Sequence, residues 1–464
     1  MKKFEQLIPK SVFALGEIFS KNSFEIALVG GCVRDLFFEI NSNDYDFATN
    51  AYPDKIIKLV DKWADSLWTT GEKFGTIGVM KNGLKFEITT FRSDKYKANS
   101  RKPQVIFGDT LIGDLSRRDF TINAMAIKLP NLELIDEFGG LNDLSAKILK
   151  TPIDPETSFN DDPLRIMRLF RFIAQLDFLP DKLTIQAAGN LKDRLDIISR
   201  ERISQELEKL IMSDKPIKAL DAMTTWQIMH KIIPELPKLK LEIDERGRHK
   251  DNYWHSLKVL EQGIILAKQR NFADNLTIRL ACLLHDIGKS STRKFNSTGK
   301  VTFYGHDIVG SHLAYNRLKA LRFNKKVVQD VAKLVKLHMR FYGYAGSVWT
   351  DSAARRYAHD AGDLLDLLHI LSRADCTTSQ QKLKQKLSAA YDDLEARIKR
   401  LNKQEEIRNI RPSLNGHEIM EILHIKSGAT VGKAYKYMLN YRFANGEISK
   451  SQAKKVLLNW WQNN

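Results

Sequence analysis

Two carboxylates at alternate positions, Asp44 and Asp46, are the first residues in the chain with a clear capacity for chemistry. Alternate residues of a strand point to one face of a sheet, so these two side chains can converge on one point. The segment Leu28–Asp35 before them has the pattern of an apolar strand, a turn at Gly30 and Gly31, and a short helix. Convergent carboxylates beside a turn that can approach a triphosphate predict a magnesium–nucleotide site. The chemistry indicated is nucleotidyl transfer.

A third acidic ligand for two magnesium ions is expected at Glu87. It lies in a predicted strand, Lys85–Phe91, in which Phe86 and Ile88 face one side and Glu87 faces the other. An isolated Asp-x-Asp pair is usually a solvated turn. The glycine pair before it and Glu87 after it favour a two-metal site. One ion would lower the pKa of an attacking 3′-hydroxyl, and the other would neutralise the departing pyrophosphate.

Adjacent arginines follow in the segment Arg117–Ala126. Their forked donors suit the phosphates and sugar of a nucleotide, although a surface salt-bridge patch would show the same pattern.

Another carboxylate–guanidinium pair occurs where Pro163 opens a predicted helix, Pro163–Gln175. Asp161 or Asp162 can cap that helix. At positions i and i+3, Asp162 and Arg165 are also expected to share a helical face. The carboxylate can accept from an exocyclic amine, and the guanidinium can donate to an unprotonated ring nitrogen. Cytosine and adenine present these groups and uracil and guanine present the reverse, so the pair predicts a site for CTP and ATP.

A separate set of histidines and aspartates lies in the second half of the chain. The adjacent pair His285 and Asp286 ends a predicted helix and offers nitrogen and oxygen donors, which together suit a divalent metal. A single buried histidine would more often be an ordinary core residue, and this interpretation is preferred for His359 and His369. The ordered set consists of His255, His285, Asp286 and Asp375, with His306, His312 and His338 between them.

The composition, 43% hydrophobic and 28% charged, is that of an ordinary folded protein, but the net charge of +17 favours a polyanionic partner. The three cysteines are widely spaced and form neither a disulfide framework nor a thiolate zinc motif, which fits a reducing cytosol. The N-terminus lacks the apolar core of a signal peptide, and no apolar run reaches the ~18 residues of a membrane span. We therefore expect a cytoplasmic protein with no membrane association, and we predict no protein partner.

The chain divides into a first part with alternating helix and strand signals and a longer part in which helical periodicity dominates. Four domains are expected, over residues 1–150, 151–240, 241–378 and 379–464. Strands are expected in the first of these domains at Phe24–Val29, Tyr45–Ala48, Thr76–Met80, Lys85–Phe91 and Met125–Leu129.

The last of the four domains is strongly basic and has tyrosines between its cations. A charge run on a helix is usually a solvated face, but tyrosine rings can stack on bases or riboses, which favours RNA. The predicted RNA-binding residues are Lys399, Arg400, Lys433, Lys436 and Arg442.

These motifs occur together in a characteristic order, and in that order the chain closely resembles the bacterial class II CCA-adding tRNA nucleotidyltransferase and poly(A) polymerase family. The motifs that carry the resemblance are Leu28–Asp35, Asp44-x-Asp46, Glu87, Arg117–Ala126, Asp161–Arg165 and Glu201–Glu206. The resemblance implies a multidomain α+β fold. A polymerase β-like nucleotidyltransferase head with a small mixed sheet would be followed by an all-α neck, an HD domain and a C-terminal tail.

The resemblance also implies roles for individual residues. Asp44, Asp46 and Glu87 would bind two magnesium ions, and Asp162 and Arg165 would recognise the base. The other nucleotide contacts would be made by Gly30, Gly31, Arg34, Arg117, Arg118, Asp119, Asn123 and Arg168. One departure is Asp161, where the family usually has glutamate, so an orienting role of that residue is in doubt.

The second half of the chain resembles the HD metal-dependent phosphohydrolase superfamily. This resemblance implies metal ligands at His255, His285, Asp286 and Asp375, with His306 and His338 as ligands of a second metal, whose identity stays open. The chemistry would be phosphoester hydrolysis, for example of 2′,3′-cyclic phosphate ends of damaged tRNA.

Full CCA addition to the tRNA 3′ acceptor end, from CTP and ATP, is the favoured interpretation. Family members that add only cytidines are shortened after the third carboxylate strand, whereas here the polar stretch Ser93–Ser116 has full length and is expected to form a mobile loop. The alternatives are a poly(A) polymerase, a CC-adding enzyme, and an HD phosphohydrolase with a nonpolymerising RNA-binding head.

Overall fold

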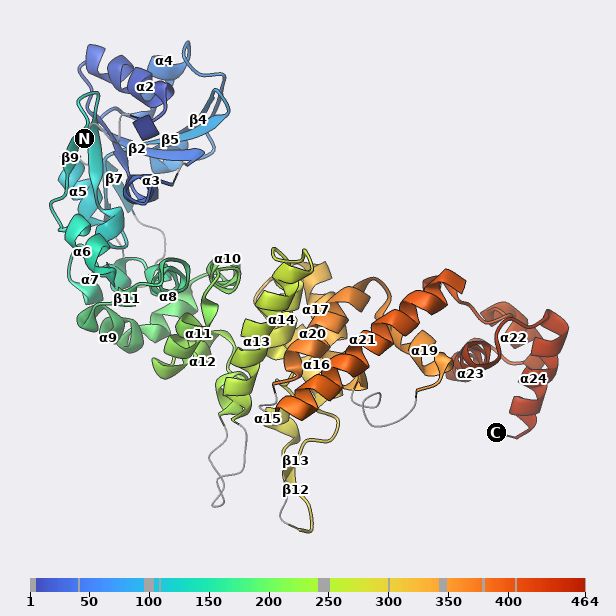
Figure 1. Cartoon of the computed structure of the whole chain (residues 1–464). Coiled ribbons are helices and arrows are strands. Elements are labelled where there is room, and N and C mark those ends of the chain that lie inside the picture. The colour runs from blue at the N-terminus through green and yellow to red at the C-terminus, as the bar shows by residue number, and fades with distance from the viewer. Residues whose placement is uncertain are drawn as a thin grey trace. The chain divides into compact units, whose positions relative to one another are not determined.

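The computed structural model describes residues 6–40, 42–95, 104–107, 110–240, 251–298, 301–341, 349–377, 380–404 and 407–463 (Figure 1). The chain forms two compact units that meet in sequence between Pro234 and Glu235, and each is described by itself. None of the described helices has the length and apolar character that a membrane crossing requires.

The first unit begins with a seven-stranded mixed sheet, in the order β3-β4-β5-β2-β1-β8-β9. Within this sheet β2 and β5 pair in parallel and the other neighbours are antiparallel. The strands are β1 (Ile26–Val29), β2 (Asp44–Thr49), β3 (Ser66–Trp68), β4 (Thr76–Lys81), β5 (Leu84–Thr90), β8 (Ala126–Leu129) and β9 (Glu133–Ile135). The five expected strands are present, whereas the short edge strands β3 and β9 were not predicted.

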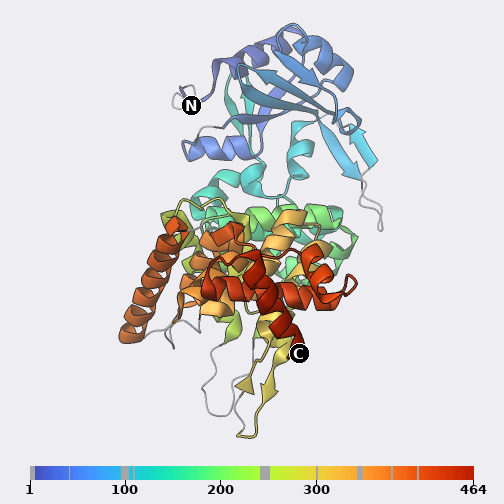
Figure 2. The same cartoon turned by 90° about the vertical axis from the view of Figure 1, so that its right-hand side faces the viewer.

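Helices α2 (Lys10–Lys21) and α4 (Pro53–Val60) pack on this sheet, where they appear in blue (Figure 2). On α2 the apolar side chains of Val12, Leu15 and Phe19 are fully buried. Their spacing of three and four residues forms the stripe that an amphipathic helix turns toward a core. The other helices of this region are α3 (Gly31–Phe37), α5 (Leu111–Ser116) and α6 (Gly140–Ala146).

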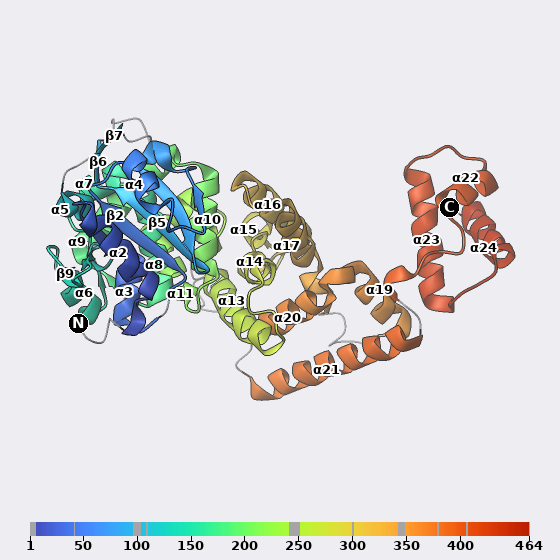
Figure 3. The ribbon, with the colours of Figure 1, turned by 90° about the horizontal axis from the view of Figure 1, so that it is seen from above.

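The stretch Ser93–Ser116 was expected to be a mobile loop, and this expectation is wrong for its described parts. Strand β6 (Arg92–Lys95) pairs with β7 (Gln104–Phe107) in an antiparallel ribbon, and residues 111–116 form α5 (Figure 3). The connecting residues 96–103 lie outside the described residues. The prediction of a loop overlooked Val105, Ile106 and Phe107 in β7, which are residue types typical of a strand.

The rest of the first unit is helical. Helix α8 (Leu164–Leu176) packs against α10 (Arg200–Ile211) and α11 (Pro216–Thr225). Most of α8 is buried, including Ile166, Leu169, Phe170 and Ile173. The remaining helices are α7 (Pro155–Asp161), α9 (Lys182–Asn190) and α12 (Met229–Ile232). The two-residue strands β10 (Ile148–Leu149) and β11 (Leu179–Pro180) pair in parallel.

The second unit is almost entirely helical. Its first part contains α13 (Asn252–Gln269), α14 (Leu276–Leu284), α15 (Lys289–Thr292), α16 (His306–Ala320), α17 (Lys325–Leu337), η5 (His338–Phe341), α19 (Asp351–Ala361) and α20 (Leu365–Asp375). A small hairpin, β12 (Lys294–Phe295) and β13 (Val301–Thr302), precedes α16. Its last part contains the long helix α21 (Gln381–Gln404), then α22 (Gly416–Leu423), α23 (Ala429–Asn445) and α24 (Lys450–Gln462). A mixed-sheet head followed by helical regions confirms the predicted fold class.

Candidate functional site

The three acidic residues of the first unit are brought together by the parallel pairing of β2 and β5. Asp46 lies directly opposite Glu87 in this ladder, and Asp44 lies opposite Lys85. Both aspartates are exposed, while Tyr45 between them is buried in the core. Because directly paired residues project to the same side of a sheet, the three carboxylates leave the sheet on one face. The register places the three residues on one face of the sheet, as the alternation pattern predicted, and their role as metal ligands stays a prediction.

The electrostatics of this trio suit a cation. Partial burial raises the pKa of Asp46, and the negative charges of Glu87 and Asp44 raise it further, against the opposing effect of Arg118. The ammonium of Lys85 lies 2.6 Å from Glu87 Oε1 and offsets part of the negative charge. Repulsion among neighbouring carboxylates is relieved when a divalent cation binds between them, so the donor set fits magnesium.

The glycine turn lies against the same carboxylates. Gly30 has φ +81°, a conformation that side chains disfavour. A Cβ at this position would lie 3.0 Å from Arg118 Nη1 and 3.5 Å from Asp46 Oδ2. The backbone here therefore approaches the site more closely than any residue with a side chain would allow. Helix α3 begins at the next residue, Gly31.

Arg117 and Arg118 are held by one buried carboxylate, Asp114, which the sequence analysis did not single out. Asp114 Oδ1 accepts from Arg117 Nε at 3.0 Å, and Oδ2 accepts from Arg118 Nη2 at 3.1 Å. Asp114 is 1% exposed, and although burial raises its pKa, the two guanidinium charges outweigh that effect and lower it. The carboxylate stays ionised and fixes both arginines at the end of α5.

Asp119, Asn123, Arg34 and Arg168 form a second buried network. Asp119 Oδ1 accepts from Asn123 Nδ2 at 3.0 Å, and its Oδ2 accepts from Arg168 Nε at 2.7 Å. Asn123 Oδ1 in turn accepts from Arg34 Nη1 at 2.9 Å. Burial raises the pKa of Asp119, but the charge of Arg168 and the hydrogen bonds outweigh it and lower the pKa to about 2. Asp119 is therefore a positioning residue for the arginines around it.

Asp162 and Arg165 do not share a helical face, so that expectation is wrong. Asp162 lies between α7 and α8, where its Oδ1 accepts from the Leu164 amide at 3.2 Å, which confirms the capping alternative. Arg165 is buried and donates to Ser158 Oγ at 2.8 Å and to the carbonyl of Arg117. The two side chains still line one cavity, but the guanidinium of Arg165 is already engaged by the protein.

That cavity, of about 930 Å³, is lined by all the predicted nucleotide-binding residues and by Asp44 and Asp46, but not by Glu87. Its size is adequate for a nucleoside triphosphate. Nine cationic and five acidic side chains line it, so it favours an anion. The cations are Arg34, Arg92, Arg117, Arg118, Arg165, Arg168, Arg171, Arg202 and Lys209.

Several of these lining residues were missed from the sequence. Arg171 lies 3.1 Å from buried Glu206, and its guanidinium stands over the ring of Phe172 at 4.3 Å. Arg202 lies 3.6 Å from Asp162. The spacing of Arg165, Arg168 and Arg171 by three residues was a usable signal, because such residues lie close together on a helix.

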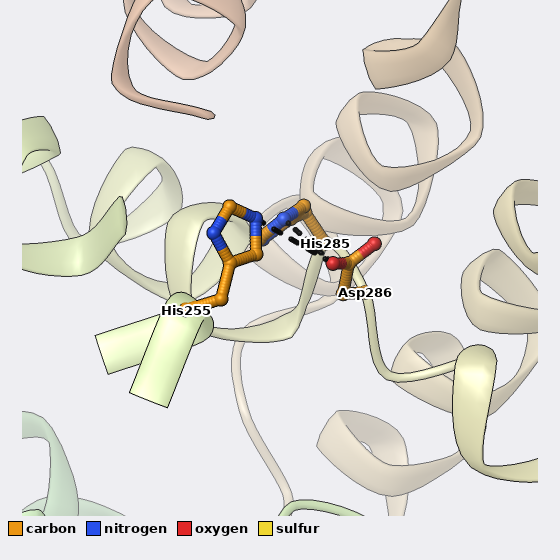
Figure 4. A group of neighbouring side chains, drawn as sticks. All are labelled: His255, His285 and Asp286. Carbon is orange, nitrogen blue, oxygen red and sulfur yellow. Dashed lines mark ion pairs between the residues drawn. The ribbon is translucent and has the colours of Figure 1, made fainter. Parts of the chain in front are cut away.

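The histidine-rich set of the second unit converges on the carboxylates of Asp286 and Asp375. Figure 4 shows His255, His285 and Asp286 of this set. His285 Nε2 lies 3.3 Å from Asp286 Oδ2 and 3.5 Å from Asp375 Oδ1. His255 Nε2 lies 2.9 Å from Asp375 Oδ1 and 3.6 Å from Asp286 Oδ2. All four predicted ligands of one metal are thus within reach of one point.

The other oxygen of Asp286 faces two further histidines. His306 Nε2 lies 3.4 Å and His338 Nε2 lies 3.8 Å from Asp286 Oδ1. Asp286 therefore belongs to two groups of possible metal ligands, one on each carboxylate oxygen. This arrangement can hold two neighbouring cations bridged by one carboxylate.

The ring orientations in this histidine cluster test whether a metal fits. The Nδ1 atoms of His285, His306 and His338 face the carbonyls of Cys282, Phe303 and Val335 at 2.9, 2.8 and 2.6 Å. An Nδ1–H that donates to a carbonyl leaves Nε2 without a proton and free to bind a metal. These three Nε2 atoms are buried and have no hydrogen-bond partner within the described part of the chain. Thr377, 3.1 Å from His255 Nδ1, is a fourth orienting group and was missed from the sequence.

The charges in the histidine cluster support the same conclusion. Burial lowers the pKa of His285, but Asp286 and Asp375 outweigh it and raise that pKa to about 10, so without a metal His285 holds a second proton at pH 7 that a bound cation would displace. Burial and the charge of His285 lower the pKa of His338 to about 4, so His338 is neutral at pH 7. Two buried carboxylates thus attract positive charge that a divalent cation would supply.

Comparisons with known proteins match these regions separately. A family model described as "Poly A polymerase head domain" matches residues 26–150, and one described as "HD domain" matches residues 252–379. The region of the carboxylate trio and the region of the histidine cluster are thus each similar to one of these two domain families. A third model, "Probable RNA and SrmB- binding site of polymerase A", matches residues 177–239 of the helical region after the head.

Relatives of the chain include a CCA-adding enzyme of Pediococcus pentosaceus, 38% identical over 239 residues, which are 51% of this chain and 57% of that protein. The chain thus spans about half the length of the curated relatives it matches. Solved structures with the same fold include a Bacillus stearothermophilus CCA-adding enzyme in complex with CTP, at 22% identity and TM-score 0.62, covering 98% of this chain and 99% of the other. A Thermotoga maritima CCA-adding enzyme complexed with tRNA has 20% identity and TM-score 0.62, covering 99% and 98%. These findings confirm the predicted resemblance.

The predicted RNA-binding residues after the HD domain fall into two groups. Lys399 and Arg400 on α21, and Lys433 and Lys436 on α23, are exposed. The side chain of Arg442 is only 13% exposed and pairs with Glu447 at 3.2 Å. Its guanidinium is thus mostly covered by the protein, and Arg442 is poorly placed to contact RNA.

Proposed function

We propose that this chain is a template-independent nucleotidyltransferase that adds or repairs the 3′-terminal CCA of tRNA from CTP and ATP. The observation that carries the proposal is the β2–β5 pairing, which gathers Asp44, Asp46 and Glu87 on one face beside an arginine-lined cavity. The basic cavity suits a triphosphate and the carboxylates suit cations. Together they provide the groups that nucleotidyl transfer requires.

Each part of the head would have a distinct task in this reaction. Gly30 lets the backbone approach the triphosphate, while Asp114 holds Arg117 and Arg118 beside it. Two magnesium ions, when bound by the carboxylates, would activate the primer 3′-hydroxyl and neutralise the leaving pyrophosphate. Asp162 and Arg165 would select the base, and Arg165 would then exchange its contact with the Arg117 carbonyl for one with the base.

The choice of CCA addition is supported by the names of the relatives and by the solved structures that contain CTP or tRNA. A poly(A) polymerase or a CC-adding enzyme would share the head motifs, and the description of the matching head model does not separate them. The proposed substrates favour a cytoplasmic location for the protein. The three free cysteines fit such a location, because thiols stay reduced there.

The proposal is tested by offering tRNAs that end before CCA, after C and after CC, together with an oligoadenylate, each with one labelled triphosphate at a time. We expect CTP to extend the first two tRNAs and ATP to extend the third. Asp46→Asn should abolish every addition, whereas Arg165→Ala should mainly disturb the choice of nucleotide. Extension of oligoadenylate with many adenosines would instead identify a poly(A) polymerase, and full incorporation by Asp46→Asn would overturn the metal assignment.

We further propose that the HD domain hydrolyses phosphoesters, with 2′,3′-cyclic phosphate ends of tRNA as the candidate substrate. The supporting observation is the set of imidazole Nε2 atoms facing Asp286 and Asp375. A divalent metal bound there would supply a nucleophilic water at neutral pH.

Hydrolysis of 2′,3′-cyclic nucleotides should be measured with added Mn²⁺, Co²⁺, Ni²⁺ or Mg²⁺. Asp286→Asn should remove this activity and leave CTP addition intact, since Asp286 belongs to a different unit from the head. A wild-type protein that hydrolyses none of these substrates with any of the four metals would refute the HD proposal.

A further inference from the structure

A basic groove of about 760 Å³ lies in the second unit, away from the histidine cluster. Three helices, α17, α19 and α23, contribute to it, and each provides residues spaced by three or four positions. Helix α17 provides Lys333 and Lys336, and α23 provides Lys436 and Asn440. The remaining lining residues are Leu337, Arg340, Trp349, Ala353, Arg356, Tyr357 and Asp360. The groove therefore joins the HD domain to the basic tail.

The groove carries five cationic side chains and one carboxylate. Arg340 pairs with that carboxylate, Asp360. The other four cations, Lys333, Lys336, Arg356 and Lys436, are exposed and form no ion pair with any residue that the structure describes. Charged side chains gathered without counter-charges repel one another, so this group is stabilised by an anionic partner.

The arrangement of the cations distinguishes a chain of phosphates from a single anion. The four free cations come from α17, α19 and α23, and each is exposed rather than buried around one point. A free phosphate or nucleotide is bound instead by donors that converge and are largely buried. Cations spread over several elements match the repeated charges of a nucleic-acid backbone.

We propose that this groove binds the phosphate backbone of the RNA substrate, so that the HD domain acts as an RNA-binding surface in addition to any hydrolytic role. The proposal rests on the proposed tRNA-directed function. It assigns Lys333, Lys336 and Arg356 of the HD domain to the surface that includes the tail residue Lys436.

The groove is separate from the metal cluster, although the same segment serves both. Lys336 and Arg340 line the groove on either side of His338, whose Nε2 lies 3.8 Å from Asp286 Oδ1. His338 is 1% exposed, whereas Lys336 is exposed to solvent. Replacing the lysines therefore changes the groove without replacing any candidate metal ligand.

Helix α17 offers a matched control for the experiment. Lys333→Ala/Lys336→Ala removes two exposed charges inside the groove, and Lys325→Ala/Lys326→Ala removes two exposed charges from the start of the same helix, outside the groove. Binding of the full-length variants to tRNA lacking CCA is measured by filter binding over a range of salt concentrations. Circular dichroism melting confirms that both variants are folded.

We expect the groove variant to bind several-fold more weakly and its log Kd to depend less steeply on log salt, by roughly two contacts. The control variant should bind as the wild type does. Equal binding by the two double variants would overturn the inference, as would a wild type that binds no RNA.

Single-turnover CTP addition to the same tRNA separates this inference from the proposed function. A wild type that binds RNA with groove-dependent affinity but adds no nucleotide would refute the proposed function and leave the groove assignment standing. A wild type that adds CCA while the groove and control variants bind alike would refute the groove alone.

Discussion

At the scale of single residues, two buried aspartates organise the arginines of the head. Asp114 holds Arg117 and Arg118, and Asp119 holds Arg168 directly and Arg34 through Asn123. Guanidinium groups that carry several donors can be fixed on one side by a carboxylate while other donors remain for a ligand. The aspartates therefore fix the positions of these guanidinium groups in the absence of a ligand.

Gly30 allows a sharp test of the close approach of the backbone. Gly30→Ala and Gly83→Ala both place a side chain at positive φ, +81° and +77°, which costs roughly 1–2 kcal/mol of stability. Only at Gly30 would the new Cβ meet Arg118 and Asp46, because Gly83 has no atom within 4 Å.

We expect similar losses of thermal stability in the two glycine variants, measured by differential scanning fluorimetry. CTP addition should fall at least tenfold in Gly30→Ala and stay near wild type in Gly83→Ala. Equal activity of the two variants would show that the close approach at Gly30 does not matter.

Asp119 predicts a pH dependence of stability. Its folded pKa of about 2 lies below the unfolded value of roughly 3.9, so its ionised form stabilises the fold above the unfolded pKa, and this contribution is lost as the pH falls toward 2. Asp119→Asn should lower the free energy of unfolding at pH 7 by about 2–3 kcal/mol. In urea denaturation the difference from wild type should shrink at pH 3.

A surface aspartate provides the control for this measurement. Asp177 also has a pKa lowered to about 2, by hydrogen bonds with Lys215 and Lys218, but these lysines are mostly exposed. Asp177→Asn should have a much smaller effect at either pH because solvent screens the pair. A constant difference between wild type and Asp119→Asn from pH 7 to pH 3 would contradict the role given to Asp119.

At the scale of elements, the position of helix α16 determines whether His306 can join His338 and Asp286 in the second group of possible metal ligands. Helix α16 begins at His306 and packs against the start of α15, where Gly310 of α16 contacts Gly288. A Cβ at Gly288 would lie 2.1 Å from the His306 carbonyl oxygen and 2.6 Å from the Gly310 amide nitrogen. The close contact of the two backbones therefore holds His306 near Asp286.

Gly288→Ala should push α16 away and weaken the site made by His306, His338 and Asp286. We expect equilibrium dialysis with Mn²⁺ or Co²⁺, carried out in an Asp46→Asn background to remove the head metal site, to show one metal bound at the histidine cluster instead of two, together with a lower melting temperature. Gly305→Ala is the matched control, because Gly305 has positive φ but no neighbouring atom within 4 Å of its Cβ. That variant should keep both metals, and retention of two metals by Gly288→Ala would contradict the packing argument.

At the scale of the whole molecule, the chain combines two compact units. The first carries Asp44, Asp46 and Glu87 on one face of its sheet, and the second carries two groups of possible metal ligands that share Asp286. The head cavity lies wholly in the first unit, and the histidine cluster and basic groove lie wholly in the second. Ligands of one unit should therefore stabilise that unit alone, since a ligand shifts only the equilibrium of the state it binds.

Calorimetry of the full chain should show two unfolding transitions. Mg²⁺ with CTP should raise the transition temperature of the first unit only. At a hundredfold excess of ligand over Kd the stabilisation should be about 2.7 kcal/mol, and Asp46→Asn should abolish it. Mn²⁺ without nucleotide should raise the transition temperature of the second unit, and Asp286→Asn should abolish this second shift. A single transition that responds to both ligands would show that the two units unfold together.

The sequence by itself determined the residues that act and the chemistry they suit. The alternation of Asp44 and Asp46, the charge at Glu87 and the His285–Asp286 pair are local patterns, because the direction of a side chain in a strand or helix follows from the backbone period. The five main strands and the helical second half were predictable for the same reason.

The tertiary structure alone decided which of these residues meet and which are free. The parallel pairing that sets Asp46 opposite Glu87 and the Arg117 carbonyl that engages Arg165 depend on partners far along the chain. The ion pair of Arg442 with Glu447, by contrast, joins near neighbours in the sequence. The basic groove could not be predicted because its lining residues come from separate elements, whereas the spacing of Asp114 from Arg117 and Arg118 by three and four residues was a local signal that was overlooked. Local periodicity fixes which face a residue occupies, whereas long-range packing fixes what lies against that face.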